Sequence, residues 1–163
     1  MNVAANARSL LGHPAGWIAT GFGSGLSPRA PGTIGSLAAV LPWWLWLRHL
    51  DWPGYLAVLV AGTGLGVWAS SWVIARTRIA DPQLVVWDEF IGLWIALFLA
   101  PAGAWWLLAG FALFRLFDIW KPWPVRWADR NVHGGLGVML DDLLAGAYAL
   151  GCLQAAVWLV NRG

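Results

Sequence analysis

Four long stretches without a charged residue divide this sequence and constrain its fold more than any other feature. They comprise 18 residues between Arg29 and Arg48, 24 between Asp51 and Arg76, 25 between Glu89 and Arg115, and 19 between Asp142 and Arg162. A helix that crosses a bilayer needs about 20 apolar residues, within a range of about 17–25. Lipid admits only helices and closed barrels, and no strand-like alternation is present. We therefore expect an all-α integral membrane bundle of about four to five apolar helices.

The composition excludes most other classes of protein. Hydrophobic residues make up 60% of the 163 residues and charged residues 11%, whereas soluble domains have about 45–50% and about 25%. A soluble fold of this size buries only about 70% of its surface, so it could not hide so much apolar area. The length fits one membrane-embedded domain over residues 1–163. A net charge of only +2 gives no reason to expect a nucleic-acid partner.

The third stretch is either one kinked span or a helical hairpin, because Pro101-Ala102-Gly103 interrupts it. In a hairpin the two helices extend to roughly Leu84–Ala100 and Ala104–Trp120. The hairpin collects eight of the ten Lys and Arg residues on one side, whereas a single span divides them five and five. The eight are Arg8, Arg29, Arg76, Arg78, Arg115, Lys121, Arg126 and Arg130; the other two are Arg48 and Arg162. The positive-inside rule favours the hairpin and places the larger group in the cytoplasm.

The hairpin also brings most of the carboxylates to one depth near the cytoplasmic surface. It sets Glu89 opposite Arg115 and Asp88 near Asp118, and the last stretch opens on the same side. The converging acids are six of the eight in the chain: Asp88, Glu89, Asp118, Asp129, Asp141 and Asp142. Carboxylates at apolar helix ends are costly and mark a functional site, and six of them together need cations. Oxygen ligands with a single cysteine in the chain indicate Mg²⁺ or Mn²⁺ rather than zinc.

These acids also have structural interpretations. Asp141 and Asp142 could simply favour a helix N-terminus through its dipole. Glu89 and Arg115 could form an ion pair that only holds the two helices of the hairpin together.

A cationic segment follows the hairpin. It contains Arg115, Lys121, Arg126, Arg130, Asn131 and His133, and then Gly134, Gly135 and Gly137. Arginine matches phosphate oxygens bidentately, lysine adds a point charge, and glycines expose backbone N–H groups to an anion. Trp120, Trp123 and Trp127 alternate with the cations, which is typical of a segment in the headgroup layer. The alternative is an ordinary positive-inside loop with an aromatic belt.

Two glycine-containing segments complete the pattern. The first, residues 21–36, offers Ser24 and Thr33 near a helix start, where they could hold an anion or only cap the helix. The second is the stripe of Gly62, Gly66 and Ser70, which predicts close helix packing.

Three blocks of this sequence together resemble one known family. They are GFGSGLSP…PGTIGSLAA (residues 21–39), VVWDEFIGLW (85–94) and FRLFDIWKPWPVRWADRNVHGGLGVMLDDLLAG (114–146). The chain resembles bacterial phosphatidylglycerophosphatase A, in order from about Gly21 to Gly146. The resemblance implies a Mg²⁺-dependent enzyme of the inner membrane that converts phosphatidylglycerophosphate into phosphatidylglycerol. It implies a site formed by Asp88, Glu89, Asp118, Asp129, Arg130, His133, Asp141 and Asp142, without assigning the metal ligands among them.

Our hypothesis from the sequence is a phosphomonoester hydrolase at the cytoplasmic face of the bacterial inner membrane, a multi-pass protein acting on an anionic phospholipid. We assign the metal to Asp88, Glu89, Asp118 and Asp142, and catalysis to Asp129, His133 and Asp141. We assign substrate binding to Arg115, Lys121, Arg130, Asn131, Ser24 and Thr33. Attack by an activated water is preferred over attack by an aspartate, because an all-helical chain lacks the paired-Asp loop after a strand.

The alternative from another class is a small transporter or ion-conducting protein that uses the intramembrane acids. Acids spread through the bilayer depth or inverted repeats would favour it, but the acids gather on one side and no repeat is visible. A structural scaffold leaves the acids unexplained. A phosphotransferase that joins a CDP-lipid to an alcohol is disfavoured because its Asp-Gly-x-x-Ala-Arg pattern is missing.

Overall fold

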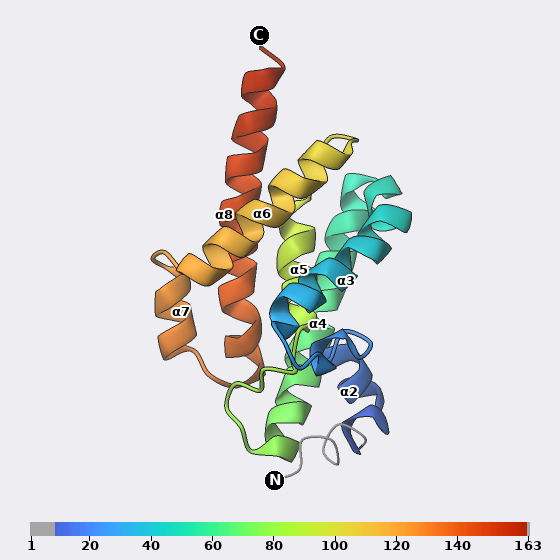
Figure 1. Cartoon of the computed structure of the whole chain (residues 1–163), viewed down its shortest axis with the longest axis vertical. Helices are drawn as coiled ribbons and strands as arrows, with labels where there is room; N and C mark the ends of the chain where they lie inside the picture. The colour runs from blue at the N-terminus through green and yellow to red at the C-terminus, as the bar shows by residue number, and fades with distance from the viewer. Residues whose placement is uncertain (1–8, 163) are drawn as a thin grey trace.

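The computed structural model describes residues 9–162, and within that range it contains helices and no strand (Figure 1). This confirms the all-α expectation. The helices are α2 (Pro14–Ala19), α3 (Pro31–Leu45), α4 (Trp52–Thr77), α5 (Trp87–Ala96), α6 (Ala104–Trp120), α7 (Val125–Asn131) and α8 (Gly134–Val160). Two single 3₁₀ turns, Ser24–Leu26 and Leu47–His49, precede α3 and α4.

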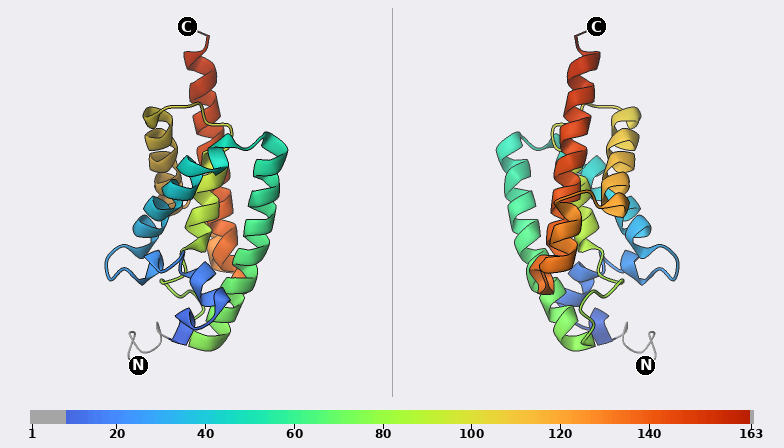
Figure 2. Two further views of the ribbon diagram at one scale, coloured as in Figure 1. Left: turned by 90° about the vertical axis from the view of Figure 1, so that its right-hand side faces the viewer. Right: turned by 90° about the vertical axis from the view of Figure 1, so that its left-hand side faces the viewer.

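Helices α5 and α8 form the centre of the bundle. Helix α8 contacts α4, α5, α6 and α7, and α5 also packs against α3, α4 and α6 (Figure 2). The two central helices touch at their backbones, because a Cβ on Gly146 would collide with the carbonyl oxygen of Gly92. The predicted small-residue stripe of α4 also packs closely, with Gly62 against Ile91 of α5 and Gly66 against Met139 of α8. Glycine therefore sets how closely the central helices approach.

Within residues 9–162, two helices are long and apolar enough to cross a membrane. Helices α4 and α8 have 26 and 27 residues, with mean hydropathies of 1.6 and 1.8 over their most apolar windows. Only 33% and 22% of those windows are buried, so most of this apolar surface faces outward, unlike the core helix of a soluble protein.

This is fewer spanning helices than the four to five that we expected. Three further apolar helices are present, but α3, α5 and α6 have only 15, 10 and 17 residues. A helix of ten residues rises about 15 Å, half the thickness of a hydrocarbon core. The predicted hairpin forms around Pro101–Gly103, but its first helix runs from Trp87 to Ala96 and not from Leu84 to Ala100.

The helices give the bundle two distinct ends. Helices α3, α5 and α8 begin, and α4 and α6 finish, toward the same side of the bundle, where α7 also lies; in Figure 1 this side faces down, and we call it the lower end. The cations at or next to this end are Arg29, Arg76, Arg78, Arg115, Lys121, Arg126 and Arg130. Arg48 and Arg162 lie at the upper end, and Arg8 is outside the described residues. For the described part of the chain, the charges thus divide as the hairpin predicts.

Candidate metal and phosphate site

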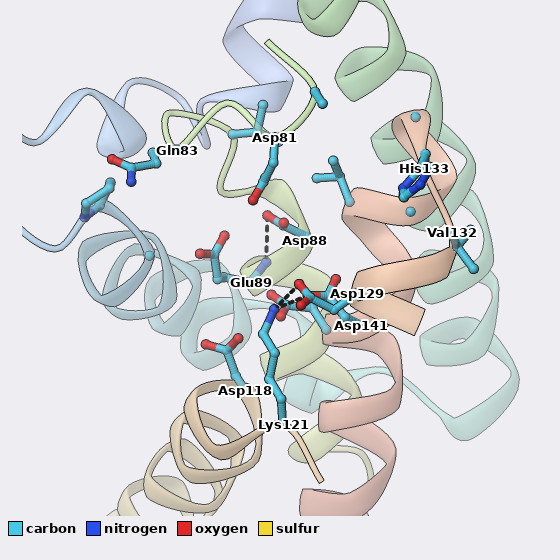
Figure 3. A pocket seen from close by; sticks show the side chains of 18 of the residues that line it. Asp81, Gln83, Asp88, Glu89, Asp118, Lys121, Asp129, Val132, His133 and Asp141 are labelled. Carbon is cyan, nitrogen blue, oxygen red and sulfur yellow. Dashed lines mark hydrogen bonds and ion pairs between the residues drawn. The ribbon is translucent and has the colours of Figure 1, made fainter. Parts of the chain in front are cut away.

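A cavity of about 660 Å³ opens at the lower end, between the first turns of α3, α5 and α8 and the end of α6 (Figure 3). Seven carboxylates line it: Asp81, Asp88, Glu89, Asp118, Asp129, Asp141 and Asp142. The structure therefore brings together all six acids of the predicted site. Lys121 and His133, which the sequence also assigned to the site, line the same cavity.

Three of these acids lie close enough to share one ion. One oxygen from each of Asp88, Glu89 and Asp142 lies within 4.8 Å of the others. Asp88 and Glu89 occupy the first turn of α5, where the helix dipole favours negative charge. Asp142 lies on α8 and is only 4% exposed, because the backbone contact between α5 and α8 encloses it. The packing of the two central helices therefore fixes the position of this three-acid cluster.

The three-acid cluster is not satisfied by the protein alone. Glu89 Oε2 and Asp142 Oδ2 are buried and have no hydrogen-bond partner among the described residues. Burial raises the pKa of Asp88 well above its ordinary value, and the neighbouring charge of Glu89 raises it further. An unpaired buried carboxylate is costly, and oxygen-only ligands suit hard divalent cations. The residues present therefore fit a divalent cation of this kind.

Arg115 lies behind the cavity rather than in it. Its Nη1 pairs with Asp118 Oδ2 at 2.7 Å, one turn further along α6. It also donates to Thr33 Oγ1 and Ser36 Oγ on α3, both at 3.4 Å. The predicted Glu89–Arg115 pair is not among the ion pairs of the described residues, because the i,i+3 neighbour Asp118 takes its place. Arg115 thus joins α6 to α3 and orients Asp118.

Lys121 joins two of the other acids. It ends α6 in a left-handed conformation, with φ 49°. Its Nζ donates to Asp129 Oδ1 at 2.5 Å and to Asp141 Oδ2 at 2.7 Å. Burial by itself would lower the pKa of Lys121, but the two carboxylates raise it above the ordinary value. Lys121 is therefore a fixed positive charge beside the three-acid cluster.

The first turn of α3 approaches the acids closely because residue 32 is glycine. A Cβ at Gly32 would collide with Glu89 Oε1. On the other side, the exposed His133 precedes the first turn of α8 and does not cap that helix with its side chain. An imidazole that is not used for capping is available to a ligand at the cavity rim.

Besides Arg115, four residues of the predicted site do not line the cavity. Arg130 and Asn131 line a separate groove on α7, where Asn131 Nδ2 donates to the carbonyl oxygen of Trp127 at 2.7 Å. Ser24 donates to the carbonyl oxygen of Gly21 at 2.8 Å, within its own turn. Thr33, described above, contacts Arg115.

Sequence reasoning missed two residues of the cavity, Asp81 and Gln83. Asp81 was not among the six acids expected to converge at one depth. Its only signal was its position in the short connection that leads into Asp88 and Glu89. This connection folds over the start of α5, which sequence spacing does not reveal.

The fold and the site define a class: an all-helical protein with outward apolar faces and a carboxylate cavity suited to a divalent cation. Residues 17–157 match the family described as Phosphatidylglycerophosphatase A. The phosphatidylglycerophosphatase A of Escherichia coli K12 is 47% identical over 150 residues, which cover 91% of this chain and 87% of that protein. The chain belongs to the phosphatidylglycerophosphatase A family and is a phosphatase.

Two further relatives extend the comparison. The phosphatidylglycerophosphatase A of Haemophilus influenzae Rd is 43% identical over 143 residues, 87% of each chain. A protein of Bacteroides thetaiotaomicron, provisionally named a phosphatidylinositol-3-phosphatase, is 43% identical over 151 residues, 88% of this chain and 94% of that protein. No solved structure matches the chain.

Proposed function

We propose that this protein hydrolyses the terminal phosphate of phosphatidylglycerophosphate, giving phosphatidylglycerol and inorganic phosphate for phospholipid synthesis. The observation that carries the proposal is the pair of buried, unpartnered carboxylate oxygens of Glu89 and Asp142 beside the cation Lys121. The names of the Escherichia and Haemophilus relatives support the choice of lipid. Both this lipid and a phosphoinositide present a phosphomonoester above a diacylglycerol anchor, so the Bacteroides relative is compatible with the same reaction class.

The proposal places the protein in the bacterial inner membrane as a multi-pass protein, with the cavity at the cytoplasmic face. The outward apolar faces of α4 and α8 support its insertion. The cations gathered around the lower end support its orientation, since cytoplasmic segments are rich in Lys and Arg. At this position the cavity meets the phosphate groups of the lipid, whereas the membrane core holds their acyl chains.

Asp88, Glu89 and Asp142 would hold a Mg²⁺ ion, and Asp118, held by Arg115, is the fourth carboxylate that we propose for it. When bound, the ion neutralises charge on the phosphoryl oxygens and makes water a better nucleophile. The carboxylates themselves exclude an anionic phosphate from the cavity unless such a cation is present.

The remaining residues bind the substrate and move protons. Lys121 has three N–H donors and uses two for Asp129 and Asp141, so one is free for a phosphoryl oxygen. Through its hydrogen bond with Lys121, Asp141 would hold the ammonium group in position for the phosphate. Arg130, with Asn131, would bind the phosphodiester that the product retains. Ser24 donates within its own turn, and Thr33 accepts from Arg115. Both would therefore act only by shaping the first turn of α3 and the segment before it.

In the reaction, a water oxygen forms a bond to phosphorus while the bond from phosphorus to the glycerol oxygen breaks. The water loses a proton and the glycerol oxygen gains one. His133 and Asp129, at the open side of the cavity, are the groups that we propose for these transfers.

The test is phosphate release from phosphatidylglycerophosphate in detergent, with Mg²⁺ and with a chelator. We expect release that requires the metal. No release at any metal concentration from folded protein would overturn the proposal. Phosphatidylinositol 3-phosphate, assayed in parallel, would identify the preferred lipid. A transport function gains no support from the structure, because seven of the eight acids share one cavity and the eighth, Asp51, caps α4 at the other end.

A further inference from the structure

A second concavity lies on the outer side of α7 at the same end of the bundle. It has a volume of about 600 Å³. Three tryptophans and three cations line most of it: Trp120, Trp123, Trp127, Lys121, Arg126 and Arg130. We call it the α7 groove. The three indoles are exposed, Trp123 by 78%, although exposed tryptophan is unfavourable in water.

Core contacts of α7 and a hydrogen bond from α8 hold the α7 groove in place. Val125 and Ala128, on the inner face of α7, are fully buried. The hydroxyl of Tyr148, on α8, donates to the carbonyl oxygen of Trp123 at 2.8 Å. The outer face of α7 is therefore presented on a fixed support, and its side chains are free to contact a ligand.

Unlike Lys121, the two arginines of this groove lack acidic partners among the described residues. Arg126 donates only to the carbonyl oxygen of Trp120, at 3.2 Å. Within residues 9–162, the structure gives Arg130 no hydrogen bond or ion pair. They lie four residues apart on α7, so both guanidinium groups share one face of the helix. Two uncompensated guanidinium groups beside exposed indoles complement a ligand that is both anionic and apolar.

The groove adjoins the carboxylate cavity, because Lys121 lines both. The cavity contains seven carboxylates and its lining is more polar than apolar, so it suits a phosphate group with its cation better than an acyl chain. The groove offers indole faces and unpaired arginines. A phospholipid with a terminal phosphate has matching parts in the same order: a phosphomonoester, then a phosphodiester, then acyl chains.

We infer that the α7 groove binds the phosphodiester of the lipid substrate and the first part of its acyl chains while the terminal phosphate occupies the cavity. Arg126 and Arg130 bind the phosphodiester, and Trp123 and Trp127 cover the glycerol backbone and the upper chains. This inference rests on the proposed function and adds the part of the site that selects a membrane lipid over a soluble phosphate ester.

The experiment measures KM and kcat for phosphatidylglycerophosphate in micelles of a neutral detergent, where the substrate is the only anionic lipid. The variants are Arg126→Gln with Arg130→Gln, and Trp123→Ala with Trp127→Ala. Each pair should raise KM about five- to tenfold and leave kcat within about twofold, because the lost contacts are charge-assisted or stacking contacts to a non-reacting part of the lipid. Both pairs should fold, since the buried Val125 and Ala128 and the hydrogen bond from Tyr148 to the carbonyl oxygen of Trp123 remain in each.

A matched control is available at the other end of the bundle. Arg162 stacks on Trp158 with 3.8 Å between the guanidinium carbon and the ring centroid, and the pair Trp158→Ala with Arg162→Gln should leave KM unchanged. Unchanged KM in both groove variants, with an active wild type, would overturn the inference. So would an effect seen only after phosphatidylserine is added, which would assign the groove to bulk anionic lipid. An inactive wild type would instead overturn the proposed function, and the inference with it.

Discussion

The two ends of this bundle use the same residue types for opposite purposes. At the upper end Asp51 Oδ1 accepts the N–H of Gly54 at 3.1 Å and caps α4, and Arg48 and Arg162 each stack on a tryptophan. At the lower end Glu89 and Asp142 each keep a buried oxygen without a partner. A capping carboxylate stabilises the fold by about 1 kcal/mol, whereas an unpaired buried one destabilises it. The comparison separates charges that the fold itself satisfies from charges that it leaves without a partner among the described residues.

The largest expected difference is between a carboxylate removed at the lower end and one removed at the upper end. Asp88→Asn or Asp142→Asn should lower phosphate release at least about 100-fold, because a metal ion contributes several kcal/mol to catalysis and each 1.36 kcal/mol is tenfold. Asp51→Asn at the upper end should stay within about twofold, since Asn also caps helices. The measurement is initial rate at saturating Mg²⁺, with circular dichroism as the check on folding. Full activity in either lower-end variant would remove that residue from the site.

The next effect concerns Lys121. Lys121→Gln should reduce kcat/KM about 10–100-fold, because hydrogen bonds to charged groups contribute about 1.5–3 kcal/mol. Arg48→Gln, the matched loss of a cation at the upper end, should change nothing. Equal activities in the two variants would show that Lys121, like Arg48, has only a structural role.

Gly32→Ala tests the close approach of α3 to the acids. The added methyl group collides with Glu89 Oε1, and displacing a reacting group by about 1 Å can cost up to about 100-fold, so we expect roughly a tenfold loss of rate. Gly64→Ala is the control, because its methyl group meets no atom within 4 Å. A Gly32→Ala protein with wild-type rate would mean that Glu89 can shift without consequence.

The smallest expected effect is on the free energy of unfolding, and it is tested by one substitution in each half of α8. Gly146→Ala places a methyl group against the carbonyl oxygen of Gly92, and such overpacking costs about 1–3 kcal/mol. Gly151→Ala, five residues further along, meets no atom within 4 Å and should be neutral or stabilising by up to about 1 kcal/mol. Thermal unfolding in detergent measures both. Equal melting temperatures would argue against the backbone contact between α5 and α8.

The comparison also shows how far the sequence alone could lead. The lengths of the uncharged stretches predict the apolar helices, and the division of cations predicts their directions. The sequence predicts that α5 starts near Leu84, but the helix begins at Trp87. The N–H of Val86 donates to the carbonyl oxygen of Ala19 at 2.8 Å, which holds the preceding residues out of the helix. At the other end of α5, the hydroxyl of Tyr55 donates to the carbonyl oxygen of Trp94 at 2.7 Å. These tertiary contacts leave no local pattern in the sequence.

The residues of the site also divide into those that the sequence predicts and those that it does not. Six acids could be placed together because the directions of the apolar stretches bring their charged ends to one depth. Asp141 and Asp142 were expected at a helix start but lie inside α8, which begins at Gly134. The partner of Arg115 was misassigned because Asp118 and Glu89 are both within reach of its side chain, and only packing decides between them. Asp81 and Gln83 could not be found, because they lie in a connection whose path over the cavity depends on its contacts.

Metal binding tests the central claim most directly, because it examines the three-acid cluster without depending on the identity of the lipid. Mn²⁺ is a spectroscopic substitute for Mg²⁺ at carboxylate sites, so free Mn²⁺ can be followed by electron paramagnetic resonance during titration of the purified protein in neutral detergent. We predict a saturable site in the wild type and in Asp51→Asn that is lost or strongly weakened in Asp142→Asn. Equal Mn²⁺ binding by Asp142→Asn and the wild type, or no binding by either, would contradict the account.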